Sequence, residues 1–167
     1  MQKIIEFSFD YRNSQELLLE MLSKLNSTAE ELTREFRELP AAEAALYCVT
    51  ALSDCIRLPS RGKTAYNALV EGFAGSEGCA MAYQLLCSLC GIPCQVVSGR
   101  MDGSPYYWNI ITLDQESYHV DAYTCTRYGV EQGFLLSDSE LSGNYWWEVD
   151  RYPACRDPHF REQFLGR

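Results

Sequence analysis

Few side chains in this sequence could support covalent or acid–base chemistry. His119 lies two residues before Asp121, so in an extended strand the imidazole and the carboxylate would point to the same face. Cys79 lies three residues after Ser76, which in a helix places the thiol one turn deeper than the hydroxyl on the same side. A nucleophile, a base and an acid that orients the base are the groups that acyl transfer requires.

The chain holds eight cysteines: Cys48, Cys55, Cys79, Cys87, Cys90, Cys94, Cys125 and Cys155. An even number fits the disulfide framework of a small secreted domain, but the sequence reaches Glu6 before a signal-like apolar core forms. Cys87 and Cys90 have the spacing of metal ligands, yet they fall in an apolar run typical of a buried helix, and no second such pair follows. We therefore expect reduced thiols that pack as small apolar side chains, with disulfides as the alternative, no metal, no cofactor and a cytoplasmic location.

The composition excludes several classes of protein. The 167 residues are 47% hydrophobic and 22% charged, which is typical of a globular domain. The 14 basic side chains are outnumbered by 23 acidic ones, the formal net charge is -9, and no basic patch that would bind nucleic acid is present. No apolar run approaches the roughly 18 residues that span a bilayer. We expect a soluble protein that binds neither nucleic acid nor membranes.

The first half of the chain predicts one strand and then helices. Residues 5–11 alternate apolar and polar side chains, as a half-buried strand does. Five helices are expected after it, each with apolar residues at helical spacing and a capping residue or a proline near its start. They begin at Ser14, at Thr28 with Glu31 completing a capping box, after Pro40 and ending at Cys55, at Thr64 and ending at Gly72, and at Ser76. The last, over residues 76–90, is apolar nearly all round, so we expect it to be buried on all sides.

The period of the pattern changes after Gly91. Residues 95–99, 106–113 and 118–123 are rich in β-branched and aromatic side chains and are separated by turn clusters at residues 102–105 and 114–115. Helices followed by hairpin-linked strands predict an α+β fold, with the buried helix packed on an antiparallel sheet.

We expect one domain over residues 1–167, because no internal repeat or flexible linker divides the chain. Its core is predicted over about residues 40–125, preceded by an N-terminal strand and helices over 1–39. The remainder, 126–167, is an aromatic tail with Tyr145, Trp146, Trp147, Tyr152 and Phe160. These rings either pack the tail onto the sheet or line a binding groove.

A helix that begins at Ser76 and is followed by three strands has the element order of a papain-like or transglutaminase-like core. The stretches Ala74-Gly75-Ser76-Glu77-Gly78-Cys79-Ala80, Gly91-Ile92-Pro93-Cys94, Tyr106-Tyr107-Trp108-Asn109 and Tyr118-His119-Val120-Asp121 carry a closer likeness. On these motifs, residues from about 63 to 121 resemble the core of the transglutaminase-like superfamily, which has the papain-like cysteine protease fold, particularly its bacterial members. The likeness covers about 60 residues and continues loosely through 134–138 and 152–155.

The resemblance implies a site, and the sequence departs from that site. The nucleophilic cysteine of the family falls on Ser76, its histidine on Tyr106 and its acid on Asp121. Trp108 and Asn109 match the family's strand, where Trp108 either covers the cleft or is an aromatic residue of the core. A serine hydroxyl needs a base with a pKa near neutrality. Tyrosine, with a reference pKa of about 10, is protonated at pH 7 and does not supply one. Two of the three catalytic identities are therefore absent, and the triad is degenerate.

Other interpretations of these residues stay open. Ser76 is a good N-cap residue and can hold the helix start for structural reasons, or it can be an engineered replacement of a cysteine. Cys79 is an alternative nucleophile if the register shifts, although a buried thiol in a helix is typically a core residue. His119 is an alternative base, or an ordinary residue of the sheet.

These residues predict a pseudoenzyme: a non-catalytic transglutaminase-like protein that binds or scaffolds a peptide, protein or glutamine-bearing ligand through the inherited cleft. The alternatives are an active thiol or hydroxyl acyl-transferase or peptidase that uses Cys79 or Ser76, and a purely structural partner in a bacterial complex. If the resemblance holds, Tyr106 faces the start of the Ser76 helix and donates a hydrogen bond to Asp121 or to a backbone group.

Overall fold

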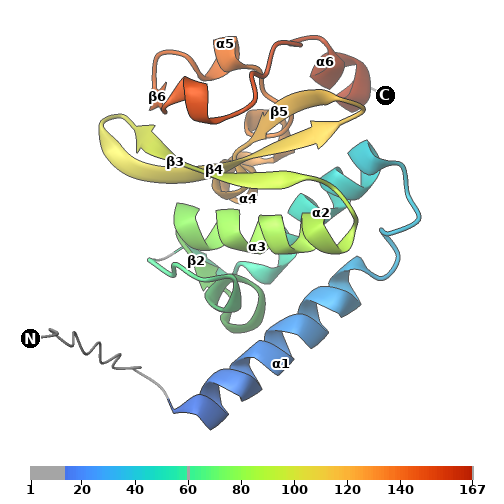
Figure 1. Cartoon of the computed structure of the whole chain (residues 1–167), viewed down its shortest axis with the longest axis vertical. Coiled ribbons are helices and arrows are strands. Elements are labelled where there is room, and N and C mark those ends of the chain that lie inside the picture. Colours follow the sequence, from blue (N-terminus) through green and yellow to red (C-terminus); the bar gives the residue numbers. More distant parts are fainter. Residues whose placement is uncertain (1–13, 60, 167) are drawn as a thin grey trace, which may run out of the picture.

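The computed structural model describes residues 14–59 and 61–166, so the strand predicted over residues 5–11 lies outside the described residues. Helices cover one face of a curled sheet, and the C-terminal segment covers the other (Figure 1). No helix in the described ranges is long and apolar enough to cross a membrane.

Helix α1 (Gln15–Thr33) begins where the sequence predicts, because the backbone amide of Leu17 donates to the Oγ of Ser14 at 3.3 Å. The break predicted at Thr28 is wrong, since α1 continues through this residue. Ala29 and Thr33 follow on one face of the same helix and are fully buried against the core. Ending the helix at Thr28 would lose this burial, which outweighs a local capping signal.

Helix α2 (Ala41–Cys55) follows Pro40 as predicted. The chain then forms a short strand β1 (Leu58–Pro59), a π-helical turn η1 (Asn67–Glu71) and a strand β2 (Phe73–Ala74) that pairs in parallel with β1.

The helical turn η1 has the start and end that the sequence predicts. The Oγ1 of Thr64 accepts from the amide of Asn67 at 3.1 Å, which caps the turn at its start. At its end Gly72 adopts a left-handed φ of 78°.

Helix α3 (Ser76–Leu89) is the central helix of the core. Cys79, Tyr83 and Leu86 are fully buried along it, but Met81 and Ser88 are exposed, so the expectation of burial on all sides is wrong. The sheet covers one side of α3 and helices α1 and α2 cover others, which leaves a strip of its surface uncovered.

The sheet is antiparallel, as the sequence predicts, with the order β5-β4-β3-β6. Its strands are β3 (Cys94–Met101), β4 (Ser104–Leu113), β5 (Glu116–Val120) and β6 (Tyr145–Trp146). Both tight hairpins have two successive residues with positive φ: Asp102 and Gly103 at 48° and 78°, then Asp114 and Gln115 at 48° and 74°. Such turns match the right-handed twist of the strands that they join.

The third predicted strand ends three residues early. β5 stops at Val120 because the carboxylate of Asp121 accepts the backbone amide of Thr124 at 2.8 Å and so caps helix α4 (Ala122–Tyr128). Tyr123, expected on the strand, is therefore helical.

Alternate residues of β4 face opposite layers. Asn109 faces α3, where its Nδ2 donates to the backbone oxygen of Ala80 at 3.0 Å. Tyr106, Trp108 and Ile110 face the other way and pack with Val97 and residues of the C-terminal segment, namely Leu136, Leu141 and Cys155. Whether a residue of β4 has an odd or an even number therefore decides which layer its side chain enters.

The C-terminal segment consists of short elements: η2 (Val130–Gln132), α5 (Asp138–Leu141), η3 (Val149–Arg151) and α6 (Phe160–Leu165). The prediction that aromatic side chains pack this tail onto the sheet is confirmed for most of them. The ring of Trp147 lies 5.9 Å from that of Trp108, and the ring of Phe160 lies 5.2 Å from that of Tyr118. Trp146 is the exception, with 58% of its surface exposed.

Gln115 is a non-glycine residue held at a φ of 74°, a conformation that costs an L-residue free energy. Replacing Gln115 with Gly should raise the free energy of unfolding by about 0.5–1 kcal/mol, because glycine adopts this φ without strain. The matched control is Gly103→Gln in the other hairpin, which should lower it by a similar amount. Urea denaturation of both variants checks the pair, and shifts of the same sign would contradict it.

Candidate functional site

A recess of about 290 Å³ lies at the N-terminal end of α3. Its lining comes from the loop before η1, the start of α3 and the start of β4: Arg61, Gly62, Lys63, Gly75, Ser76, Glu77, Pro105 and Tyr107. The Nζ of Lys63 pairs with the Oε2 of Glu77 at 3.5 Å, and the Lys63 side chain is largely exposed. The rim of the recess therefore carries both signs of charge.

Ser76 lies in this recess as the first residue of α3, but it is not the N-cap. Gly75 occupies that position, so the expected capping role of Ser76 is wrong. The backbone amides at the start of α3 give the recess the positive end of a helix dipole.

A close approach of two backbones builds the recess. A Cβ on Gly78 would lie 2.6 Å from the backbone oxygen of Gly62, closer than real Cβ atoms come. The amide of Gly75 donates to the same oxygen at 2.9 Å. The loop that carries Arg61 and Lys63 is therefore held directly against the start of α3.

Tyr106 belongs to the opposite face of the sheet. It packs with Trp108 and Tyr145 in the layer that faces the C-terminal segment, and its neighbour Tyr107 is the tyrosine of β4 that lines the recess with Ser76. The expectation that Tyr106 faces the start of α3 is therefore wrong. Successive residues of a strand point to opposite faces, so a one-residue offset separates the two layers.

The other expectation for Tyr106, a hydrogen bond to Asp121, is confirmed. The phenol donates to the Oδ2 of the carboxylate at 3.0 Å, and the phenol of Tyr145 donates to the same oxygen at 2.6 Å. Thr124 adds its backbone amide and its hydroxyl, each at 2.8 Å. Asp121 is fully buried, and no cationic side chain of the described ranges pairs with it.

Burial controls the protonation of this cluster. It raises the pKa of Asp121, although the four donated hydrogen bonds oppose the shift. Burial and the nearby carboxylate raise the pKa values of Tyr106 and Tyr145 well above that of free tyrosine. Both phenols therefore act as hydrogen-bond donors at neutral pH rather than as bases.

Cys79, the alternative nucleophile, is fully buried in α3 and is not among the residues that line the recess. Burial, with a smaller contribution from Asp121, raises the pKa of its thiol to about 12. At pH 7 a thiol with this pKa is ionised to about 1 part in 10⁵, and the thiolate is the reactive form.

His119, the alternative base, has both ring nitrogens occupied. Its Nδ1 accepts from the indole Nε1 of Trp108 at 2.9 Å, and its Nε2 lies 2.9 Å from the Oδ1 of Asp138. The ring is fully buried and lies on the sheet face away from α3, and burial lowers its pKa. His119 therefore has no free nitrogen for a nucleophile at the recess.

Trp108 and Asn109 do not line the recess, and the interpretation of Trp108 as an aromatic residue of the core is confirmed. Trp108 is buried on the far face of the sheet, and Asn109 is buried against α3. The Oδ1 of Asn109 has no hydrogen-bond partner among the described residues.

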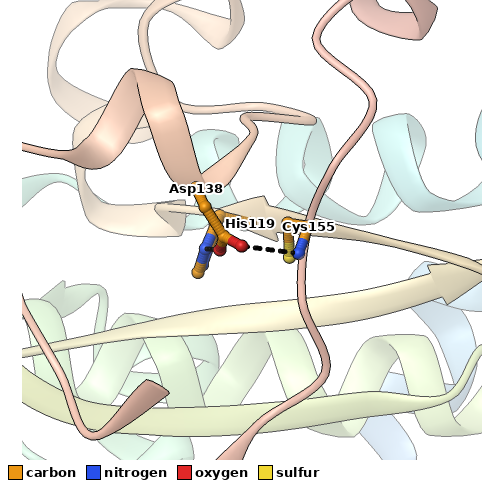
Figure 2. A group of neighbouring side chains, drawn as sticks. All are labelled: His119, Asp138 and Cys155. Atoms are coloured by element: carbon orange, nitrogen blue, oxygen red, sulfur yellow. Dashed lines mark hydrogen bonds and ion pairs between the residues drawn. The ribbon is translucent and has the colours of Figure 1, made fainter. Parts of the chain in front are cut away.

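Sequence reasoning missed a cluster of three groups that could hold a metal ion: His119 of β5, Asp138 of α5 and Cys155 of the loop after η3 (Figure 2). Their potential ligand atoms lie within 4.8 Å of one another. Asp138 and Cys155 are 19 and 36 positions from His119 in the sequence, so no local spacing indicates the cluster.

The hydrogen bonds of this cluster oppose metal binding. Trp108 has only an N–H to offer, so the Nδ1 of His119 must be the acceptor and the proton must lie on Nε2. Nε2 then donates to Asp138 and has no lone pair for a metal. The second oxygen of Asp138 accepts the backbone amide of Cys155 at 3.0 Å. The cluster fastens the C-terminal segment to the sheet.

No family model and no curated protein matches this chain. Among solved structures, one described as the crystal structure of a TGase is similar, with 13% sequence identity and a TM-score of 0.46. The match covers 85% of this chain and 37% of that one, so the chain spans well under half the length of this neighbour. At this level of similarity the comparison identifies neither a family nor an activity.

The tautomer of His119 can be measured by NMR. The chain has only two histidines, so a His159→Gln variant shows which ring signals belong to His119. We expect nitrogen-detected NMR to place the proton on Nε2 of His119, with no change of its ring signals between pH 7.5 and pH 6.5. A proton on Nδ1 would contradict the bond from Trp108 and would free Nε2 for a metal.

The same group should contribute to stability in a pH-dependent way. The pKa of His119 is lower in the folded chain than in the unfolded one, so its stabilising contribution is present above about pH 6.5 and is lost as the pH falls. The difference in free energy of unfolding between the unaltered protein and His119→Gln should therefore shrink between pH 7.5 and pH 5.

Proposed function

We propose that this chain is a non-catalytic, transglutaminase-like domain that binds a peptide or protein segment in the recess at the start of α3. One observation carries the proposal: the recess holds Ser76 without a thiol or an imidazole in its lining. The thiol of Cys79 is buried inside α3, and the imidazole of His119 lies on the other face of the sheet, where it bonds to Trp108.

The chemistry of the lining supports this proposal. Its titratable side chains are Arg61, Lys63, Glu77 and Tyr107, and the carboxylate of Glu77 is paired with Lys63. A serine hydroxyl in this lining has no imidazole beside it to remove its proton. The buried Asp121, which the resemblance assigns to orienting a histidine, instead accepts hydrogen bonds from two phenols and from Thr124.

The form of the recess supports a short peptide ligand. Its volume of about 290 Å³ lies at the lower end of small-molecule sites, which span roughly 300–1,000 Å³. The charged side chains of both signs and the hydroxyl of Ser76 offer hydrogen bonds to a ligand. The ring of Tyr107 offers an apolar surface. Such a lining suits one or two side chains of a polar segment better than a large cofactor.

Peptide binding can be tested with a display library of random peptides selected on the full chain. Peptides bound at the recess should lose affinity at least about tenfold when Ser76 is replaced with Trp, because the indole fills the space that the ligand occupies. Ser88→Trp is the matched control, since Ser88 is an exposed serine at the other end of the same helix. Selected peptides with equal affinity for both variants would contradict the proposed position.

The absence of catalysis has its own test. The unaltered chain should not transfer a fluorescent primary amine to a glutamine-containing peptide above background. With Ser76→Cys as the starting variant, adding Tyr107→His should accelerate alkylation of position 76 by iodoacetamide at pH 7 by about tenfold or more, because an adjacent imidazole stabilises the thiolate. Adding Tyr106→His should not, because residue 106 faces the other layer.

Two outcomes would contradict the assignment of the faces or the non-catalytic proposal. If Tyr106→His accelerates the alkylation and Tyr107→His does not, residue 106 reaches the recess and our assignment of the faces is wrong. If the unaltered chain transfers the amine and Cys79→Ala abolishes this activity, the protein is a thiol acyl-transferase and the non-catalytic proposal fails.

A further inference from the structure

Four cysteines form a row of neighbouring thiols where α2 meets α3 and the start of β3: Cys90, Cys48, Cys87 and Cys94. The two inner thiols, Cys48 and Cys87, are fully buried. Cys90 and Cys94 at the two ends are half-buried. The row lies near the C-terminal end of α3, at the opposite end of that helix from the recess.

Cys90 and Cys48 are the best placed of these thiols for a covalent bond. Their Sγ atoms lie 3.7 Å apart, and a disulfide requires about 2.05 Å. Cys90 is the C-cap residue of α3 and precedes Gly91, which adopts a φ of 71°. Because regular helix ends before Cys90, its backbone can adjust by the small amount that closes this gap.

We propose that Cys48 and Cys90 are a site of oxidative modification, at which a small-molecule disulfide such as oxidised glutathione converts the two thiols into an intramolecular disulfide. The solvent-accessible Cys90 reacts first, and the buried Cys48 completes the reaction.

The reaction balances in two exchange steps. The thiolate of Cys90 attacks one sulfur of the small disulfide, forms a mixed disulfide and releases one small thiolate with its electron pair. The thiolate of Cys48 then attacks the Cys90 sulfur and releases the second small thiolate. The two protein thiols are oxidised, the small disulfide is reduced to two thiols, and the two protons of the cysteines pass to the released sulfurs.

The other members of the row are less suited to this reaction. Cys87 is enclosed in α3, so a small disulfide does not reach it from solvent. Cys94 is the acceptor of a hydrogen bond from the Nδ2 of Asn109 at 3.5 Å and contacts Cys87 rather than Cys48. Within residues 14–59 and 61–166, the four thiols do not provide three ligand atoms close enough to surround one metal ion.

The reaction should be slow at neutral pH. Burial and the neighbouring Cys48 raise the pKa of Cys90 to about 12, although the charge of Arg37 opposes the shift. The thiolate fraction, and with it the rate of the first step, should therefore rise about tenfold per pH unit between pH 7 and pH 9. The hydrogen bond to Cys87 and burial also raise the pKa of Cys48, which slows the second step.

The bridge would join α2 to the end of α3 and close a loop that contains residues 61–63 and 75–77, which line the recess. Closing a loop of this length stabilises the folded state by restricting the unfolded chain. We expect the thermal midpoint to rise by about 5–10 °C on oxidation and to return on reduction.

The test uses the full chain at pH 8.5 with oxidised glutathione, followed by peptide mapping without reduction. The unaltered protein should hold eight free thiols before treatment, then lose two hydrogen atoms and yield one linked peptide pair that contains residues 48 and 90. Cys55→Ser is the control, since Cys55 is a half-buried cysteine of α2 outside the row and this variant should form the same bridge.

The variants of the pair separate the two steps. Cys48→Ser should stop the reaction at a stable glutathione adduct on Cys90, and Cys90→Ser should leave Cys48 as a thiol. A bridge between Cys87 and Cys90, a stable adduct on Cys90 of the unaltered protein, or no reaction at pH 8.5 would each overturn the proposal.

Discussion

The buried carboxylate of Asp121 is the constraint on which the meeting of the sheet, helix α4 and the C-terminal segment depends. It lies at the end of β5, caps α4 and accepts phenol hydrogen bonds from Tyr106 of β4 and Tyr145 of β6. A carboxyl group removed from water and left without donors costs several kcal/mol. These donors compensate for that cost only while β4, β6 and α4 keep their relative positions.

The same kind of hydrogen bonding occupies the side chains that could otherwise act as acids or bases. A carboxylate that accepts from Tyr106, Tyr145 and Thr124 is not available to orient a base. His119 is held in the same way, between the indole of Trp108 and the carboxylate of Asp138, and the latter also accepts the amide of Cys155. On this face of the sheet the side chains with catalytic potential serve as fixed hydrogen-bonding groups that attach the C-terminal segment.

The elements of the fold were largely predictable because their signals are local. The side chain of Ser14 caps α1, and the hairpin turn at Asp102-Gly103 has the residue types that tight turns favour. The continuation of α1 through Thr28 was not predictable, because it depends on burial of Ala29 and Thr33 by segments distant in the sequence. Local capping patterns carry no information about that packing.

The site was less predictable because its assembly depends on which way single residues point. Motif matching placed the histidine position of the family on Tyr106, and the hydrogen bond to Asp121 was expected from it. In the structure Tyr107 enters the recess instead. A strand has a period of two, so an error of one residue moves a side chain to the opposite layer while the motif still matches. The hydrogen-bond partners of His119 were also not predictable, since Trp108 of β4 and Asp138 of α5 are 11 and 19 positions away in the sequence.

The distribution of polar contacts separates the recess proposed to bind a ligand from the thiol pair proposed to be oxidised. The recess offers unburied polar groups and a helix start but no nucleophile with a base, which favours reversible contacts. Among the cysteines, Cys79 is enclosed near Asp121 and its thiol is kept protonated by burial. Cys90 also has a raised pKa, but it is half-buried and its sulfur lies next to a second sulfur. Cys48 lies beside Cys90 as a reaction partner, whereas no thiol or imidazole lines the recess beside Ser76, so the two proposals assign covalent chemistry to the thiol pair and reversible binding to the recess.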